Sequence, residues 1–133
     1  MRRFALLAVV LCLAGTAAFA QDPVKVDPKH YSVISENDRV RVLKIHYGPH
    51  EKSVMHHHPD SVVTYLTDVH VKFTLPDGTS TESTGKAGEA MFTPAGNHLP
   101  ENLTDKPMDA ILVELKSRPA VHTAPAPPKK QGS

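Results

Sequence analysis

The middle of the chain is built from short runs in which apolar and polar residues alternate. The alternation is clearest in three segments, 39–47 (RVRVLKIHY), 69–75 (VHVKFTL) and 108–115 (MDAILVEL). Successive side chains of a β-strand point to opposite faces of its sheet, so this period of two is typical of strands with one buried face. Segments rich in β-branched, aromatic or threonine residues extend the series, at 31–35, 61–66, 79–84, 90–93 and 97–102. No long helix is predicted.

Turn-forming residues separate these segments. Gly48-Pro49 ends one run, and Pro76-Asp77-Gly78 is a strong hairpin signal between two others. Short strands spaced about eight to twelve residues apart indicate a sandwich or a barrel. A small closed barrel leaves an interior that can hold one ligand. The predicted fold class is therefore all-β, with a single domain over residues 29–116.

The two ends of the chain differ from this central domain. Residues 1–20 combine two arginines, an apolar run and the sequence Ala-Phe-Ala, which is the pattern of a signal peptide cleaved after Ala20. The apolar run is too short to cross a bilayer, so we expect a periplasmic or secreted protein with no membrane contact after cleavage. Residues 117–133 are rich in proline and poor in large apolar residues, and we expect a disordered tail there.

The amino-acid composition excludes several kinds of functional site. Cleavage would remove Cys12, the only cysteine, which excludes a cysteine nucleophile, a thiolate zinc site and a blue-copper centre. It would also remove two arginines, leaving 13 of the 15 basic residues against 14 acidic ones. No basic face is evident, so nucleic acid is not an expected partner. Nine histidines remain in the mature part, and the candidate chemistry lies among them.

Three of these histidines are consecutive, His56-His57-His58. Every second side chain of an extended segment shares a face, so His56 and His58 can serve one site while His57 points away. A metal centre needs at least one further ligand from elsewhere in the chain. The alternative is a solvated polar run that binds no metal. Imidazole clusters suit Zn, Fe, Ni and Cu.

The residues around these histidines resemble the two sequence motifs of the cupin family, the small jelly-roll barrels. The first motif, a glycine followed by H-x-H and then a glutamate, is matched in part between Gly48 and His58. The second motif is matched more closely, by Gly88, Pro94-Ala95-Gly96, His98 and Asn102. The resemblance covers most of residues 39–115. It implies a jelly-roll β-barrel with a small-molecule ligand inside, a homodimer, and one divalent metal ion bound by His56, His58 and His98.

The sequence departs from the family pattern at one ligand. The glutamate of the first motif falls at Val62 or Val63, and neither valine can bind a metal. Three neutral histidines leave the charge of a divalent ion uncompensated, which favours anionic ligands, oxygen or water in the open positions. In this respect the centre resembles the three-histidine sites of cupin thiol and diketone dioxygenases. The sequence does not distinguish Fe, Zn, Ni, Mn and Cu.

The position of the remaining candidate residues in the predicted strands and loops suggests where each side chain lies. The side chains expected in the pocket, with core packing or loop orientation as their alternatives, are Val62, Tyr65, Phe73, Met91 and Asn102. Histidines without the motif spacing are expected at the surface or in loops, namely His30, His46, His50, His57, His70 and His122.

Two functions remain open at this point. One is a secreted or periplasmic metal-dependent dioxygenase with a small-molecule pocket. The other is a non-catalytic protein of the cell envelope that binds a small ligand or a metal ion. The fold cannot decide between them, because cupins host many functions. A third reading, a structural partner, would require a barrel interior plugged by Val62, Tyr65, Phe92 and Leu112.

Overall fold

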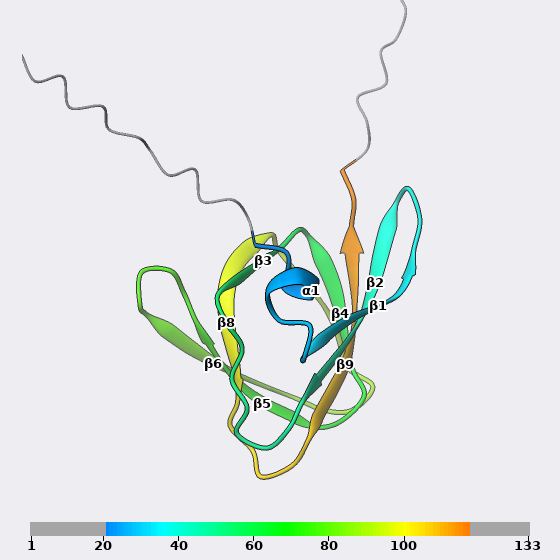
Figure 1. Ribbon diagram of the computed structural model, residues 1–133. Helices are drawn as coiled ribbons and strands as arrows, with labels where there is room; N and C mark the ends of the chain where they lie inside the picture. Colours follow the sequence, from blue (N-terminus) through cyan, green and yellow to red (C-terminus); the bar gives the residue numbers. More distant parts are fainter. Residues whose placement is uncertain (1–20, 118–133) are drawn as a thin grey trace, which may run out of the picture.

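The computed structural model describes residues 21–117 (Figure 1). The expected signal peptide, and the expected tail beyond residue 117, lie outside the described residues. Within the described range no helix is long and apolar enough to cross a membrane. The elements follow in the order α1 (Pro23–Val26), β1 (Tyr31–Glu36), β2 (Val40–Tyr47), β3 (His56–His58), β4 (Ser61–Tyr65), β5 (Val69–Thr74), β6 (Ser80–Gly85), β7 (Ala90–Thr93), β8 (Gly96–Asn102) and β9 (Met108–Leu115).

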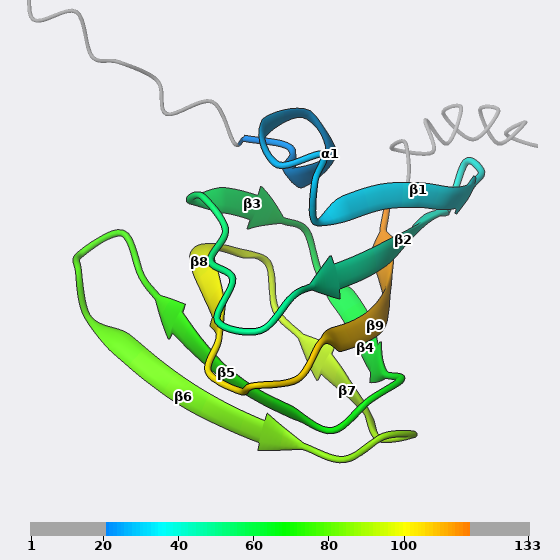
Figure 2. The ribbon, with the colours of Figure 1, turned by 60° about the horizontal axis from the view of Figure 1, so that its bottom comes forward.

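The strands form two antiparallel sheets that face each other across a common interior (Figures 1 and 2). One sheet has five strands in the order β1-β2-β9-β4-β7, and the other has four in the order β3-β8-β5-β6. Strands β2 and β9 pair over their whole length, from Val40 with Leu115 to Tyr47 with Met108. Strands β3 and β4 follow one another in the chain but lie in different sheets. The predicted all-β jelly-roll barrel is confirmed.

The alternating pattern decides which side chains enter the interior. In β4 the side chains of Ser61, Val63 and Tyr65 are buried. Val62 and Thr64, which alternate with them, are only partly buried. Strand β9 shows the same alternation, with Glu114 at its last buried position. The hydrophobic core draws on both sheets and consists of Tyr31, Leu43, Ile45, Tyr47, Val63, Tyr65, Val69, Val71, Met108, Ala110 and Leu112.

The packed domain begins before residue 29, where the sequence pattern placed its start. Helix α1 contacts β1 and β3 and covers one end of the barrel (Figure 2). Asp22 caps this helix, and Asp27 is 7% exposed. The backbone N–H of His57 donates to the carbonyl oxygen of Gln21 at 2.9 Å. The N-terminal segment therefore lies directly against the strand that carries the histidines. A four-residue helix has no detectable hydrophobic periodicity, which is why the sequence pattern did not show it.

Candidate metal centre

The structure brings three histidines from two strands together. His56 and His58 lie on β3 and are 1% and 6% exposed, while His57 between them is less buried. Strand β8 runs antiparallel to β3 and places His98 directly opposite His56. The period of two predicted that His56 and His58 share a face. Only the pairing of β3 with β8 adds His98 to that face.

The distances suit a single metal ion. One ring nitrogen from each of the three histidines lies within 4.8 Å of the others. The Nε2 atoms of His56 and His58 are 3.1 Å apart, and two ligands of one tetrahedral ion at about 2.0–2.1 Å from it are separated by about 3.3 Å. Within residues 21–117 no other group of at least three histidine and acidic side chains has this geometry.

Hydrogen bonds leave the inward nitrogens of the histidines available. The Nδ1–H of His56 donates to the carbonyl oxygen of Val54 at 2.8 Å, and the Nδ1–H of His58 donates to Glu114 Oε1 at 2.7 Å. Both acceptors lack a proton to give, so each Nε2 keeps its lone pair. The Nε2 atom of His98 is buried and has no hydrogen-bond partner within the described part of the chain. The Nε2 atoms of His56 and His58 face each other at 3.1 Å while both ring hydrogens point elsewhere, and the unpaired nitrogen of His98 lies beside them, so these residues fit a divalent metal ion.

The electrostatics favour the neutral, metal-binding form of the rings. Burial, and next the nearby His58, lower the pKa of His56 to about 4. The same two causes, with His56 adding to them, lower the pKa of His98 to about 3. Both rings are therefore unprotonated at neutral pH. A metal ion binds only the unprotonated nitrogen, so the ligands are ready without a proton being displaced from either ring.

The position of the missing carboxylate is occupied by a valine. Val63 is buried and faces the same interior as His58. The donor set therefore consists of three histidines without a directly coordinating carboxylate.

A cavity of about 470 Å³ opens beside the histidines. His58 and His98 form part of its wall, and no Lys, Arg, Asp or Glu side chain from residues 21–117 lines it. Of the residues expected in the pocket, three contribute to the wall, namely Tyr65, Phe73 and Met91.

Val62 and Asn102 do not line this cavity, and their assignment to the pocket is corrected. Val62 alternates with the inward residues of β4 and lies beside Phe92, which is 58% exposed, on the outer face of the sheet. The buried amide of Asn102 donates to the carbonyl oxygens of Gly48 and Lys106, at 3.0 and 2.8 Å. It therefore orients two loops, which was the alternative for this residue. Of the four residues that would plug the barrel, Val62 and Phe92 face outward, while Tyr65 and Leu112 face inward and line the cavity without filling it.

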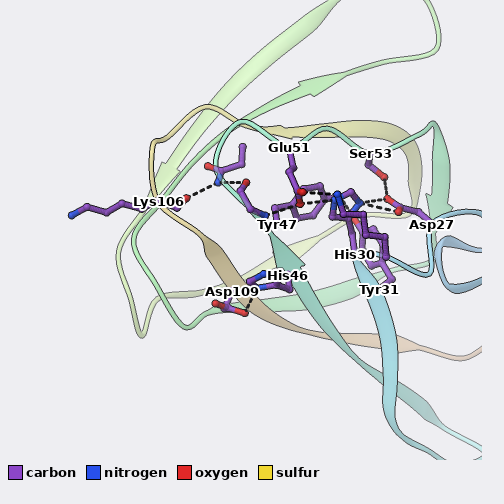
Figure 3. A network of polar contacts seen from close by, with 12 residues as sticks. Asp27, His30, Tyr31, His46, Tyr47, Glu51, Ser53, Lys106 and Asp109 are labelled. Atoms are coloured by element: carbon purple, nitrogen blue, oxygen red, sulfur yellow. Dashed lines mark hydrogen bonds and ion pairs between the residues drawn. The ribbon is translucent and has the colours of Figure 1, made fainter.

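A second polar network adjoins the centre (Figure 3). The hydroxyls of Tyr31 and Tyr47, which both line the cavity, are 2.8 Å apart. The ring of His30 stacks on that of Tyr47, with centroids 4.2 Å apart. His30 is 6% exposed, which corrects its expected place at the surface. Its Nδ1 lies 2.7 Å from a carboxylate oxygen of Asp27.

This network reaches from the surface to His56. The Nε2 atom of His30 lies 3.0 Å from Glu51 Oε2, at the protein surface. The hydroxyl of Ser53 donates to Asp27 and lies 3.3 Å from Nδ1 of His56. Sequence reasoning missed this group, because its members come from a helix end, a turn and a loop that no periodic pattern connects. The one available signal was the acid and histidine spaced three residues apart before β1.

Glu114 was also missed, although its sequence context contained a signal. It is the charged residue at an inward position of β9, in register with the apolar residues Met108, Ala110 and Leu112. A charge on the buried face of a strand is rarely retained without a partner. Here the partners are His58 and Arg41.

Three of the histidines assigned to the surface are exposed in the structure, and each faces a carboxylate. Side-chain exposures are 51%, 60% and 41% for His46, His50 and His70. The Nδ1 atom of His57 lies 2.8 Å from the side-chain oxygen of Asn97. His122 lies outside the described residues.

Comparisons with known proteins agree with this architecture. No protein-family model and no curated protein matches the chain. Among solved structures it is similar to a cupin domain from Bordetella pertussis Tohama I, with 27% identity and a TM-score of 0.61 over 65% of this chain and 92% of that one. A conserved protein with a double-stranded β-helix domain from Klebsiella pneumoniae shares 21% identity, with a TM-score of 0.51 over 64% of this chain and 74% of that one. A cupin superfamily protein from Desulfitobacterium hafniense shares 11% identity, with a TM-score of 0.50 over 65% and 76%. The last two likenesses concern the fold alone.

Proposed function

Because this chain belongs by its fold to the cupin superfamily, we propose that it is a metal-dependent dioxygenase acting on small, uncharged enols or phenols. The observation that carries the proposal is the three-histidine set, with its unpaired His98 nitrogen, at the wall of a cavity that no charged side chain of the described residues lines. The proposed ligands are His56, His58 and His98. When bound, a divalent ion such as Fe²⁺ supplies a Lewis acid for a substrate oxygen and the redox chemistry for O₂.

The cavity lining supports the choice of substrate. A free carboxylate or ammonium group buried there would find no opposite charge on the wall, and burying an unpaired charge is costly. The favoured substrate would enter uncharged and bind as a monoanion after its hydroxyl proton passes to solvent water, and its negative charge would offset part of the charge of a divalent ion held by neutral ligands. Diketones in their enol form and catechols meet this requirement, whereas amino-acid thiols do not. In the dioxygenation both atoms of O₂ enter the product, so no outside reductant is consumed.

Two tyrosines can orient such a substrate. Burial raises the pKa of both Tyr31 and Tyr47, so their hydroxyls keep their protons and act as hydrogen-bond donors. Since the two hydroxyls are bonded to each other, one can donate to a substrate oxygen while the other holds it in place. The side chains of Val63 and Phe73 make the neighbouring part of the wall apolar.

The test uses protein purified without an affinity tag and loaded anaerobically with Fe²⁺. We expect about one bound ion per chain in the wild type and in His57→Ala, and none in His98→Ala, since three ligands define the site. His57→Ala is the matched control, because it removes an outward histidine from the same triplet. Oxygen uptake is then measured with acetylacetone, catechol and cysteine, and we expect it with the first two only. Substoichiometric metal that is unchanged in His98→Ala would end the metal proposal. Tight metal binding without oxygen uptake would refute the dioxygenase and support the alternative, a non-catalytic binding protein.

The location in the periplasm or outside the cell is also a proposal, supported by the signal-peptide pattern of residues 1–20. Intact-mass analysis of the exported protein should give a chain that begins at Gln21. A chain that retains Met1 and remains in the cytosol would contradict it. The homodimer expected from the family resemblance stays a prediction, which sedimentation of the mature protein checks.

A further inference from the structure

Glu114 connects the metal centre to the N-terminal segment. Its side chain is 3% exposed, and both of its oxygens accept hydrogen bonds from side chains. Oε1 accepts from Nδ1 of His58 at 2.7 Å, and Oε2 accepts from Nε of Arg41 at 2.6 Å. Arg41 is the partner of Glu114 in the register of β2 and β9, so the contact with the guanidinium is built into the sheet.

The guanidinium is itself held from its far side. Nη1 and Nη2 of Arg41 donate to the two carboxylate oxygens of Asp22, each at 3.0 Å. This two-point contact fixes the plane of the guanidinium and keeps its Nε–H directed at Glu114. The two carboxylates and one guanidinium leave a net negative charge next to His58. Asp22 also caps α1, so the N-terminal segment supports the histidine from behind.

The ionised carboxylate determines which nitrogen of His58 carries the hydrogen. Oε2 of Glu114 faces the guanidinium of Arg41, which can only donate, and Oε1 faces Nδ1 of His58, so both carboxylate oxygens act as acceptors. An ionised carboxylate can only accept hydrogen bonds. The hydrogen of the neutral imidazole therefore stays on Nδ1, and the Nε2 lone pair points into the centre.

We infer that Glu114 is a positioning residue of the centre, which fixes the tautomer of His58 and supplies a negative charge one hydrogen bond behind that ligand. The charge stands in part for the carboxylate that Val63 does not provide. A carboxylate bonded to a ligating imidazole orients the ring and raises its basicity, and losing it costs about 10–100-fold in metal affinity. The inference about metal affinity rests on the proposed metal binding, whereas the tautomer can be measured without any metal.

The substitution Glu114→Gln tests the inference directly. The guanidinium of Arg41 can only donate hydrogen bonds, so it determines how the amide of the glutamine is oriented. The amide oxygen of the glutamine must turn toward Arg41, and its NH₂ group then faces Nδ1 of His58. The imidazole would have to accept there and move its hydrogen to Nε2, the nitrogen that a metal needs. Glu101→Gln is the matched control, since Glu101 is paired with Lys72 at 2.7 Å on β8 and faces away from the centre.

The first measurement is two-bond ¹H–¹⁵N correlation NMR of the histidine rings in metal-free protein at pH 8.5. We expect the Nδ1–H tautomer of His58 in the wild type and in Glu101→Gln, and the Nε2–H tautomer in Glu114→Gln. The wild-type spectrum tests the inference even if Glu114→Gln does not fold. An Nε2–H tautomer in the wild type, or an unchanged tautomer in a folded Glu114→Gln, overturns it.

The second measurement is Zn²⁺ affinity by competition with a chromophoric chelator. We expect about a 10–100-fold loss in Glu114→Gln and wild-type affinity in Glu101→Gln. Equal affinity in the wild type and Glu114→Gln overturns the positioning role. If the wild type binds no Zn²⁺ but the tautomer switches as expected, the proposed function fails while the control of His58 by Glu114 stands.

Discussion

Acidification of the metal-free protein gives a quantitative test of how the centre is built. His56 and His98 have pKa values of about 4 and about 3, against an ordinary value of 6.5. Burial is the main cause for both, and the neighbouring His58 adds to it. Below pH 6.5 the unfolded chain takes up protons that the folded chain does not accept until the pH approaches 4 or 3. The contribution to stability is therefore present above this window and is lost as the pH falls through it.

The size of the stability loss follows from the difference between the assay pH and the pKa of the unfolded histidines. One pKa unit corresponds to about 1.4 kcal/mol, and pH 5 lies about 1.5 units below the unfolded value. Each of the two histidines should therefore reduce the free energy of unfolding by about 2 kcal/mol between pH 7 and pH 5. Together they account for a loss of about 3–4 kcal/mol, a large share of the stability of a small domain.

The assay is urea unfolding at pH 7 and pH 5 with EDTA present, followed by circular dichroism. In His98→Gln one titrating group is gone, so the loss should shrink by about 2 kcal/mol. His57→Gln is the control and should retain the wild-type loss. A wild-type stability that is equal at the two pH values, or a loss of the same size in His98→Gln, would show that the two rings are not held neutral by the fold.

Three further substitutions test the packing around the centre, each by urea unfolding at pH 7. Gly85→Ala should cost about 1–3 kcal/mol, because the added Cβ would lie 2.4 Å from a ring carbon of Tyr65; wild-type stability would mean that this ring moves freely. Asn102→Ala should cost about 1–3 kcal/mol for each buried carbonyl left without its donor, and a cost below that range would contradict the loop-holding role. Glu101→Gln should cost less than about 1 kcal/mol, since it breaks only a partly exposed ion pair with Lys72; a larger loss would exclude it as a control.

Local patterns in the sequence were sufficient for the strands and for their buried faces. The period of two in residues 108–115 identifies Met108, Ala110 and Leu112 as inward residues, and all three are buried. The same rule placed His56 and His58 on one face. It works because the side-chain direction in a strand depends only on neighbouring residues. The motif around His98 added the third histidine through a family resemblance, and the register of β3 with β8 is consistent with it.

Only the tertiary structure decided what surrounds those histidines. Glu114 is 56 residues from His58 along the chain, and His30 is 21 residues from Glu51, so no local period connects either pair. Their contacts depend on which strands become neighbours and on how far each is shifted along its partner. Asn102 illustrates the same limit, because its inward register was visible but the two carbonyl oxygens that it holds come from separate loops. Side-chain direction is a local property of the backbone, whereas the partner of a buried polar group is set by chain closure over long separations.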